Sequence, residues 1–513
     1  MKINKLLIAN RGEIALRIMR TAKEMGIKTV AVFSEADRNA LHTQYADEAV
    51  CIGPALSSES YLRMDKIINA AKLCRADAIH PGYGFLSENP DFAEKVLENN
   101  LIFIGPTPES MRWMGNKLTA KKLAKENKVP VLPGTDTKIT STEKCIEVAK
   151  TIGFPVLVKA SAGGGGKGMR ILYSEENAYK IIHSAMHEAK SSFGDDSVFI
   201  EKYLPAPRHI ELQVLCDNFG NSVYLFEREC SIQRRHQKLI EEAPSCLLTP
   251  EKRKEMGECA IRLAKACNYR NAGTLEFLMD ENMNFYFMEM NTRLQVEHPV
   301  TELITGIDIV REQLTIAMGN PLRFNQDNLS INGHAIELRI NAEDPENNFM
   351  PDSGKLSSYK IPQGVGIRVD DGFKENQEIP VYYDSMIGKL IVWGETREIA
   401  IQRILRAIDD FEITGINTTL LFGRWVFNHL DFKNGKINTK FIENNFNAGN
   451  LNGNLSEQEE IAGAVLAVCY WNHFKASSKI SIQQEASRKN ISNWKKNRIH
   501  HSSNFPNGAS VTA

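Results

Sequence analysis

The sequence predicts a multi-domain protein of mixed α/β and α+β class. Three observations indicate this. Strands and helices alternate over the first hundred residues, two strand-like segments flank a glycine run near residue 165, and two apolar strands near residue 280 end in acidic and amide side chains. Alternation of strands and helices is typical of a parallel sheet covered by helices, whereas consecutive strands joined by turns are typical of antiparallel sheets.

Length and composition set wide limits. A chain of 513 residues can hold several domains, and its 42% hydrophobic and 24% charged residues are ordinary for a soluble protein. The net charge of −1 argues against a general nucleic-acid-binding surface. The nine cysteines contain no C-x-x-C pair, and the longest apolar run, 461–471, is too short to span a bilayer. With no signal-peptide pattern at the start, we expect a cytoplasmic protein without membrane or nucleic-acid partners.

The first elements predict a parallel sheet. Residues 5–9 form a buried strand, an amphipathic helix follows through Met25, and residues 28–33 form the next strand. The first turn lacks the G-x-G-x-x-G pattern that brings the backbone close to a pyrophosphate, so NAD binding is disfavoured. A later strand ends in a glycine loop at 80–85. This loop is either a ligand-binding edge of the sheet or a plain tight turn.

The glycine run 163–168 lies between two strand-like segments, 154–159 and 169–173. Consecutive glycines let backbone N–H groups surround phosphate oxygens without side-chain interference. The run is not a Walker A loop, because no Ser or Thr follows Lys167 and a strand rather than a helix comes next. We favour a glycine-rich hairpin that covers a nucleotide, with Lys159 projecting from the strand beneath, over a flexible linker.

Three further segments carry candidate binding residues. The strand 198–204 has an exit that could line an adenine site through backbone groups and Leu204. His209 lies in an alternating strand, where a lone histidine is more often structural. Residues 233–238 contain three cations and a histidine between two strands, which predicts an anion site, with a solvated charged loop as the alternative.

The pair of apolar strands near residue 280 predicts a metal site. A turn at 281–284 would place Glu276 opposite Glu289 and bring Asn291 to the same face of the hairpin. Two carboxylates and an amide oxygen suit a divalent cation that also holds substrate phosphates. The alternative is a surface hairpin with unremarkable acids. The stretch continues to Glu297 with more charge than a metal site requires.

The segment 334–341 alternates cleanly, so Glu337, Arg339 and Asn341 share a polar face. An arginine on a strand so apolar on its other face is a candidate substrate clamp, although a cross-strand ion pair fits equally well. The last globular helices end near Asn445.

Residues 1 to about 445 resemble biotin carboxylase, the ATP-grasp component of biotin-dependent carboxylases. Other ATP-grasp ligases share the glycine run and the metal acids, but not the segments around Arg339 and Tyr383. No single segment is specific, but together they are. The segments that carry the resemblance are 8–15, 80–88, 159–161 with the glycine run, 233–238, 289–302 and 382–389.

The resemblance implies three domains, and the sequence beyond it predicts a tail. It implies a Rossmann-like N-terminal domain at 1–115 and an ATP-grasp domain at 116–330, whose mobile glycine-rich lid spans about 132–203. A mixed α/β biotin carboxylase domain would follow at 331–447. Residues 448–513 would add a helix and a tail.

The resemblance also implies roles for individual residues. Glu297 would be the general base, and Arg339 would face the ureido oxygen of biotin. Bicarbonate would be held by Lys238, Arg293, Gln295 and Val296. Two Mg²⁺ or Mn²⁺ ions would be held by Glu276, Glu289 and Asn291. ATP would be bound by Lys117, Lys159, Gly165, Gly166, Glu201, Lys202, Tyr203, Leu204, His209, Gln233 and His236, with Glu276 and Glu289.

In the implied chemistry, Glu297 takes the bicarbonate proton and a bicarbonate oxygen attacks the γ-phosphate of ATP. The resulting carboxyphosphate breaks down to CO₂ and phosphate. Phosphate then deprotonates biotin N1′ while Arg339 stabilises the anion. Catalysis would thus depend on Lys238, Arg293, Glu297 and Arg339.

Because the sequence contains no Met-Lys-Met biotin-attachment motif, the expected partners are a separate biotin carboxyl carrier protein, a separate carboxyltransferase and a second copy of the chain. The expected reaction is the first half-reaction of an acetyl- or propionyl-CoA carboxylase. The alternatives are the biotin carboxylase component of a pyruvate carboxylase, a different bicarbonate-using ATP-grasp ligase, and a catalytically idle scaffold.

The tail has two predicted parts. A capping-box pattern at 456–459 opens a helix that runs to about Phe474. Residues 477–513 are polar and predicted to be disordered when alone. The segment 491–496 weakly resembles a subunit-bridging segment of longer acyl-CoA carboxylase chains, so the tail either docks a partner or is dispensable.

Overall fold

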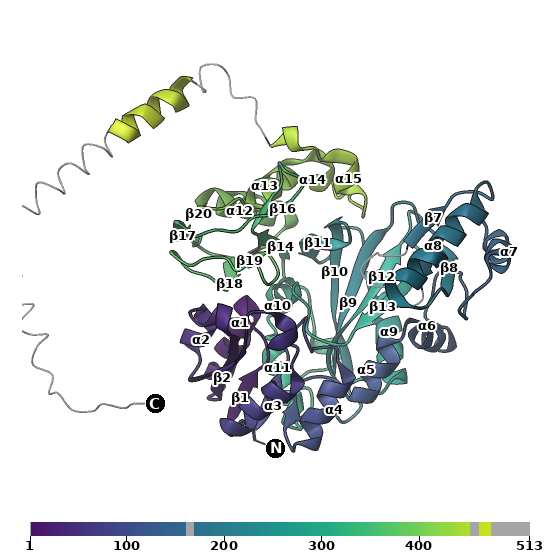
Figure 1. The fold of residues 1–513 in the computed structure, drawn as a ribbon, viewed down its shortest axis with the longest axis horizontal. Coiled ribbons are helices and arrows are strands. Elements are labelled where there is room, and N and C mark those ends of the chain that lie inside the picture. The colour runs from purple at the N-terminus through teal and green to yellow at the C-terminus, as the bar shows by residue number, and fades with distance from the viewer. Residues whose placement is uncertain (1, 161–168, 452–460, 473–513) are drawn as a thin grey trace, which may run out of the picture. The chain divides into compact units, whose positions relative to one another are not determined.

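A computed structural model describes residues 2–160, 169–451 and 461–472. The chain divides into two units, residues 1–451 and residues 452–513 (Figure 1). In the second unit, residues 461–472 are helical with exposed side chains. The predicted start of this helix at 456–460, the end at Phe474 and the segment 491–496 lie outside the described residues. Every helix in the described ranges is too short or too polar to cross a membrane.

The N-terminal region is a five-stranded parallel sheet, as predicted. Its strand order is β3-β2-β1-β4-β5. The strands are β1 (Lys5–Ile8), β2 (Lys28–Ser34), β3 (Glu48–Gly53), β4 (Ala78–His80) and β5 (Ile102–Phe103). The helices are α1 (Gly12–Glu24), α2 (Leu41–Tyr45), α3 (Met64–Leu73), α4 (Pro90–Glu98) and α5 (Pro108–Gly115).

The first turn of this sheet is closed by side chains. The Arg11 guanidinium donates two hydrogen bonds, of 2.6 and 2.7 Å, to the Asp37 carboxylate just beyond β2. The Tyr61 hydroxyl donates a third, of 2.6 Å. In dinucleotide-binding sheets an acid near this position binds a ribose. Here that acid is already paired, in agreement with the missing glycine pattern.

A small sheet with its own core makes up the region predicted to be a lid. Its order is β7-β6-β8, and β6 pairs antiparallel with β7 across the glycine run, as the hairpin interpretation requires. The glycine run itself, with Gly165 and Gly166, lies outside the described residues. The elements of this region are α7 (Thr142–Ile152), β6 (Val156–Ala160), β7 (Met169–Leu172), α8 (Ala178–Phe193) and β8 (Val198–Lys202). Figure 1 labels α7, β7, α8 and β8 on the right. Helix α6 (Lys117–Glu126) precedes this region in the sequence.

A single eight-stranded antiparallel sheet runs through the rest of this unit, in the order β13-β12-β9-β10-β11-β14-β19-β18. It crosses the predicted domain boundary at residue 330, because β11 pairs with β14. The boundaries themselves remain predictions. The strands are β9 (Arg208–Cys216), β10 (Ser222–Arg234), β11 (Gln237–Ala243), β12 (Asn271–Met279), β13 (Phe285–Asn291), β14 (His334–Asn341), β18 (Ile367–Asp371) and β19 (Met386–Gly394).

Helices cover this sheet and create two separate cores. One lies between α9 and strands β9, β12 and β13, and the other between α12, α13 and strands β14 and β19. The helices are α9 (Pro250–Ala266), α10 (His298–Thr305), α11 (Ile309–Ala317), α12 (Arg397–Asp410), α13 (Leu420–Asn428), α14 (Leu430–Lys433) and α15 (Phe441–Asn445). Short pairs β15–β16 (Glu343–Asp344, Met350–Pro351) and β17–β20 (Ser358–Lys360, Glu412–Thr414) complete the fold. The end of α15 at Asn445 agrees with the sequence prediction.

Candidate active site

The acidic hairpin β12–β13 has the predicted register. Glu276 pairs with Glu289 and Thr274 with Asn291. The turn is closed by Asp280, whose side chain accepts backbone N–H bonds of 2.9 Å from the turn. The Asn291 amide donates to Glu276 Oε1 at 2.8 Å. The three predicted metal ligands therefore lie together at the end of the hairpin.

The chemistry of these three side chains fits a divalent cation. Burial raises the pKa of Glu289, and the neighbouring charge of Glu276 raises it further. A cation between the two carboxylates would relieve this repulsion. His209 Nε2 lies 3.0 Å from Glu276 Oε2, so His209 belongs to the site and not only to the core. His209, Glu211 and Glu276 also place ligand atoms close enough together to share an ion.

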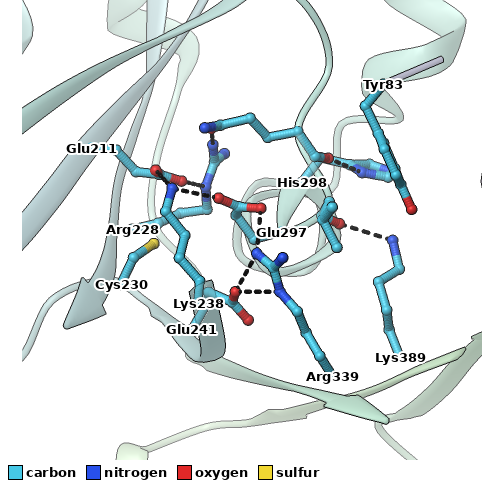
Figure 2. Close-up of polar contacts among 12 residues, drawn as sticks. Tyr83, Glu211, Arg228, Cys230, Lys238, Glu241, Glu297, His298, Arg339 and Lys389 are labelled. Atoms are coloured by element: carbon cyan, nitrogen blue, oxygen red, sulfur yellow. Dashed lines mark hydrogen bonds and ion pairs between the residues drawn. The ribbon is translucent and has the colours of Figure 1, made fainter. Parts of the chain in front are cut away.

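Glu297 is the centre of a second group of charged side chains, next to the metal ligands (Figure 2). Its carboxylate is held on both oxygens by cations from different strands. Lys238 Nζ, from β11, lies 2.7 Å from Oε1, and Arg339 Nη2, from β14, lies 2.9 Å from Oε2. Lys238 also contacts Glu276 at 2.9 Å, and Arg339 donates to Glu241 at 2.7 Å. Arg339 is therefore both an ion-pair partner and a group directed at the candidate base.

The charges around Glu297 keep it ionised. Burial alone raises its pKa, but Lys238, Arg339 and Arg228 together outweigh that effect, and the pKa lies well below the ordinary value. A proton acceptor must be ionised to act, yet a carboxylate with two bound cations is a weak base. A substrate anion that takes over one of these cations would raise the basicity of Glu297.

Arg228 is a central residue that the sequence argument missed. Its side chain is fully buried on β10, and it binds Glu211 at 2.5 Å and Gln295 Oε1 at 2.6 Å. Gln295 in turn donates to Glu276 at 2.8 Å, so Arg228 fixes Gln295 beside the metal ligands. The available signal was a charged triplet, 227–229, inside an apolar strand. Arg228 also donates to Gln213, Thr274 and Thr301.

The remaining bicarbonate candidates surround the same turn. Arg293 donates to Glu88 at 2.9 Å and to Asn291 Oδ1 at 3.0 Å, which ties the turn to the loop after β4. The Val296 carbonyl accepts a 2.8 Å bond from Lys389. Arg293 is thus linked to Glu297 through its neighbours, whereas Lys238 contacts Glu297 directly.

The ATP candidates of the lid region converge on Glu201. Lys159 Nζ lies 2.6 Å from Glu201 Oε2, and Lys121, which the sequence argument missed, contacts the other oxygen. Burial and neighbouring cations lower the pKa of Lys159 to about 8 and that of Lys121 to about 7. Lys202 differs, because its ammonium donates to two backbone carbonyls at 153–154. Tyr203 and Leu204 are half-buried at the exit of β8.

The three cations of the predicted anion segment do not gather at one point. Lys238 turns toward Glu297, whereas Arg234 donates to Asn348 and stacks on Phe349. Arg235 and His236 form the β10–β11 turn, both with positive φ, of 48° and 68°. Such backbone costs energy outside glycine and is often found at binding sites. Gln233 contacts His209 at 3.4 Å, so it lies near the metal ligands.

Lys117 and His236 lie at the edge of this group. Lys117 Nζ is 3.8 Å from Glu289 Oε2. Burial lowers the pKa of His236, and Lys440 and Lys159 lower it further. His236 therefore stands in a positive field that an anion would compensate, whereas Lys117 pairs with a predicted metal ligand.

Comparisons with known proteins cover this whole region. Family models for the N-terminal domain of biotin carboxylase, the ATP-binding domain of the carbamoyl-phosphate synthase L chain and the C-terminal domain of biotin carboxylase match residues 2–111, 116–325 and 337–444. The chain is 53% identical over 443 residues to a biotin carboxylase of Nostoc sp., covering 86% of this chain and 99% of that one. The chain belongs to the biotin carboxylase family. Its activity is that of an ATP-dependent biotin carboxylase ligase, on a three-domain fold.

Other relatives share this similarity. A pyruvate carboxylase component of Methanothermobacter thermautotrophicus is 53% identical over 440 residues, covering 86% of this chain and 89% of that one. A crystal structure of the biotin carboxylase β-γ-ATP complex from Campylobacter jejuni has a TM-score of 0.83 at 49% identity, covering 86% and 99% of the two chains. The biotin carboxylase domain dimer of Hydrogenobacter thermophilus 2-oxoglutarate carboxylase, in complex with MgADP, ADP and bicarbonate, has a TM-score of 0.82 at 47% identity, covering 86% and 98%.

Proposed function

We propose that Glu297 is the base that removes the bicarbonate proton in ATP-dependent carboxylation of biotin. One observation carries this assignment: both carboxylate oxygens of a buried glutamate are held by cations, Lys238 and Arg339, that come from two different strands. Cations that bind a carboxylate in the absence of substrate can bind a carbonate anion in its presence. Bicarbonate would be held by Lys238, Arg293, Gln295 and the backbone of Val296.

The arrangement supports an order of events. Bicarbonate takes over the Lys238 ammonium, and Glu297, with one cation fewer, accepts the bicarbonate proton. The carbonate oxygen then attacks the γ-phosphorus of ATP and ADP leaves, giving carboxyphosphate, which breaks down to CO₂ and phosphate. Phosphate takes the N1′ proton of biotin, N1′ attacks CO₂, and Arg339 stabilises the negative charge on the ureido oxygen.

ATP would lie between the lid and the acidic hairpin. We assign its binding to Lys117, Lys159, Gly165, Gly166, Glu201, Lys202, Tyr203, Leu204, His209, Gln233 and His236. When bound at Glu276, Glu289 and Asn291, Mg²⁺ or Mn²⁺ ions would neutralise the phosphate charge. The solved relatives support this assignment, because they are complexes with β-γ-ATP and with MgADP and bicarbonate.

One assay tests the proposed function: ADP release with bicarbonate, measured with and without free biotin. Stimulation by biotin supports biotin carboxylation at this site. Release that depends on bicarbonate but not on biotin would instead favour a different ATP-grasp ligase. No release at all would favour a scaffold.

For the final acceptor we propose an acyl-CoA, acetyl- or propionyl-CoA. The support is the length of the match. It extends over 458 and 461 residues in two propionyl-CoA carboxylase alpha chains, of pig and Caenorhabditis elegans, of which this chain spans 63% and 64%. The match covers 440 residues in the pyruvate carboxylase component of Methanothermobacter. Identities of 51%, 49% and 53% do not separate the two classes, so pyruvate is the second candidate. Carboxylation of each acceptor by the co-purified complex decides between them.

The proposed partners are a biotin carboxyl carrier protein, a carboxyltransferase and a second copy of this chain. The dimer proposal is supported by the solved domain dimer of the 2-oxoglutarate carboxylase. Light scattering of the purified chain tests the dimer, and affinity purification tests the other two partners. We also propose a cytoplasmic location, although some relatives are chloroplastic or mitochondrial. Cell fractionation tests it.

A further inference from the structure

Lys389 is a fully buried lysine in the middle of β19 that the proposed mechanism does not use. Its side chain is 0% exposed. The ammonium donates to the Val296 carbonyl at 2.8 Å and lies 3.3 Å from Glu13 Oε1 (Figure 2 shows the first of these contacts). Because a buried ammonium group is costly without close partners, these two contacts determine where Lys389 can lie.

The first contact reaches the backbone next to the proposed base. Val296 precedes Glu297, which stands at the N-terminus of α10. Lys389 is also the direct cross-strand partner of Arg339 in the β14–β19 pair. These two neighbouring cations therefore hold the same turn. Arg339 binds the Glu297 side chain, and Lys389 binds the Val296 carbonyl.

The second contact reaches the N-terminal domain. Glu13 lies in the first turn of α1 and is almost fully buried. It also accepts a short hydrogen bond from the Tyr83 hydroxyl, in the glycine loop after β4. Asn10 holds that loop through 2.7 Å bonds to the carbonyls of Pro81 and Tyr83. Lys389 thus joins three segments that are far apart in the sequence.

We propose that Lys389 is a positioning residue for bicarbonate, which fixes the Val296–Glu297 peptide against the N-terminal domain through Glu13. This proposal rests on the proposed function, because it concerns the same bicarbonate site. Lys389 touches no reacting atom. Its role is to keep the Val296 carbonyl, and with it the direction of the Glu297 side chain, in one place before bicarbonate binds.

The first test is Lys389→Met, which keeps most of the length of the side chain and removes the ammonium. ADP release in the presence of free biotin is measured against bicarbonate and against ATP separately. We expect KM for bicarbonate to rise about tenfold, the effect of losing one buried hydrogen bond, and KM for ATP to stay within about twofold. Equal changes in both constants, or no change in either, would overturn the proposal.

A second variant separates positioning from simple loss of an ion pair. Lys389→Met leaves the Glu13 charge buried without its partner, so the double variant Lys389→Met/Glu13→Gln removes that charge and still offers Tyr83 an acceptor. We expect the double variant to regain thermal stability and to keep the raised KM for bicarbonate. If the double variant regains both the thermal stability and the KM for bicarbonate of the wild type, Lys389 serves stability alone. The double variant also keeps the test open if Lys389→Met does not fold.

Arg397→Met is the matched control. Arg397 is a partly buried cation, bound to Glu242 at 2.7 Å and to the backbone carbonyls of Phe432 and Lys433 at 2.8 and 2.9 Å. These contacts include none of the proposed bicarbonate residues. We expect Arg397→Met to lower the thermal midpoint and leave both KM values unchanged. A raised KM for bicarbonate in Arg397→Met would show that the effect is not specific to Lys389.

Hydrogen–deuterium exchange provides a readout that does not depend on activity. Peptides covering 292–298 should exchange faster in Lys389→Met than in the wild type or in Arg397→Met. If they do, but the wild type shows no bicarbonate-dependent ADP release, the proposed function is contradicted, and what stays supported is that Lys389 anchors the Val296–Glu297 turn. Unchanged exchange in an active enzyme would contradict the positioning role alone.

Discussion

Two of the buried charge clusters among the described residues are built differently. Around Glu297, three carboxyls have pKa values that diverge. The pKa of Glu297 lies well below the ordinary value, that of Glu241 is raised by burial to about 7, and that of Glu337 is raised by burial well above the ordinary value. Between α1, α10 and β18, Arg17 and Arg368 bind Glu302, each at 2.7 Å. There the pKa of Glu302 is lowered.

The difference shows how chemistry and stability are separated in one fold. In the second, matched cluster the carboxylates are paired with arginines. Arg368 also binds Asp370 at 2.6 Å, and the pKa of Asp370 is lowered too. In the first, acids close together are driven toward opposite protonation states, a pattern typical of sites that move protons. Breaking each cluster should therefore have different consequences.

Glu297→Gln should have the largest effect. The amide cannot take a proton, so we expect kcat for biotin-dependent ADP release to fall by about 10²–10⁴-fold, the usual contribution of a general base. Nucleotide binding, measured by calorimetry with MgATP, should stay within about threefold. Near-normal turnover in this variant would remove Glu297 from its assigned role.

Arg17→Met should instead break the matched cluster. It leaves Glu302 paired with Arg368 alone, so we expect a cost below the about 3–5 kcal/mol of a buried charge left without any partner. We expect a lower urea midpoint with unchanged kcat for the folded fraction. The control is Arg112→Met, which removes an exposed pair with Glu94 and should leave the urea midpoint nearly unchanged. A kcat loss in Arg17→Met would mean that the two clusters are coupled.

The two clusters should also respond to pH with opposite sign. The pKa of Glu241 in the folded protein, about 7, lies above its ordinary value of 4.5, so its stabilising contribution is lost as pH rises through 7. Glu241→Gln should gain thermal stability relative to the wild type between pH 5 and 8. The pKa of Glu302 is lowered, so Glu302→Gln should be less stable at pH 8, with the deficit vanishing as pH falls below about 4.5. Parallel pH curves for the two variants would contradict this contrast.

Local parts of the site followed from the sequence, and long-range parts did not. Glu276 and Glu289 face each other because one short turn sets the register of adjacent strands, which the turn residues reveal. Lys238 and Arg339 come close to the same carboxylate because β11 pairs with β14, about a hundred residues away in the sequence. The periodicity of the sequence does not predict this pairing. The match to a family supplied these positions by resemblance, whereas Arg228 and Lys121 were missed because a buried cation on a strand or helix resembles a surface one in sequence.

A third group of charges, Lys121 and Lys159 around Glu201, tests the same contrast on a smaller scale. Two lysines share one carboxylate, and burial with the charge of neighbouring lysines lowers their pKa values to about 7 for Lys121 and about 8 for Lys159. An ATP polyphosphate would raise both pKa values, so nucleotide binding at pH 8 should take up on the order of one proton. Calorimetry in buffers of different ionisation enthalpy measures this uptake, and Lys121→Met should reduce it by more than half. Heats that do not depend on the buffer would mean that both lysines are already charged, and the group would then resemble the matched cluster rather than the site around Glu297.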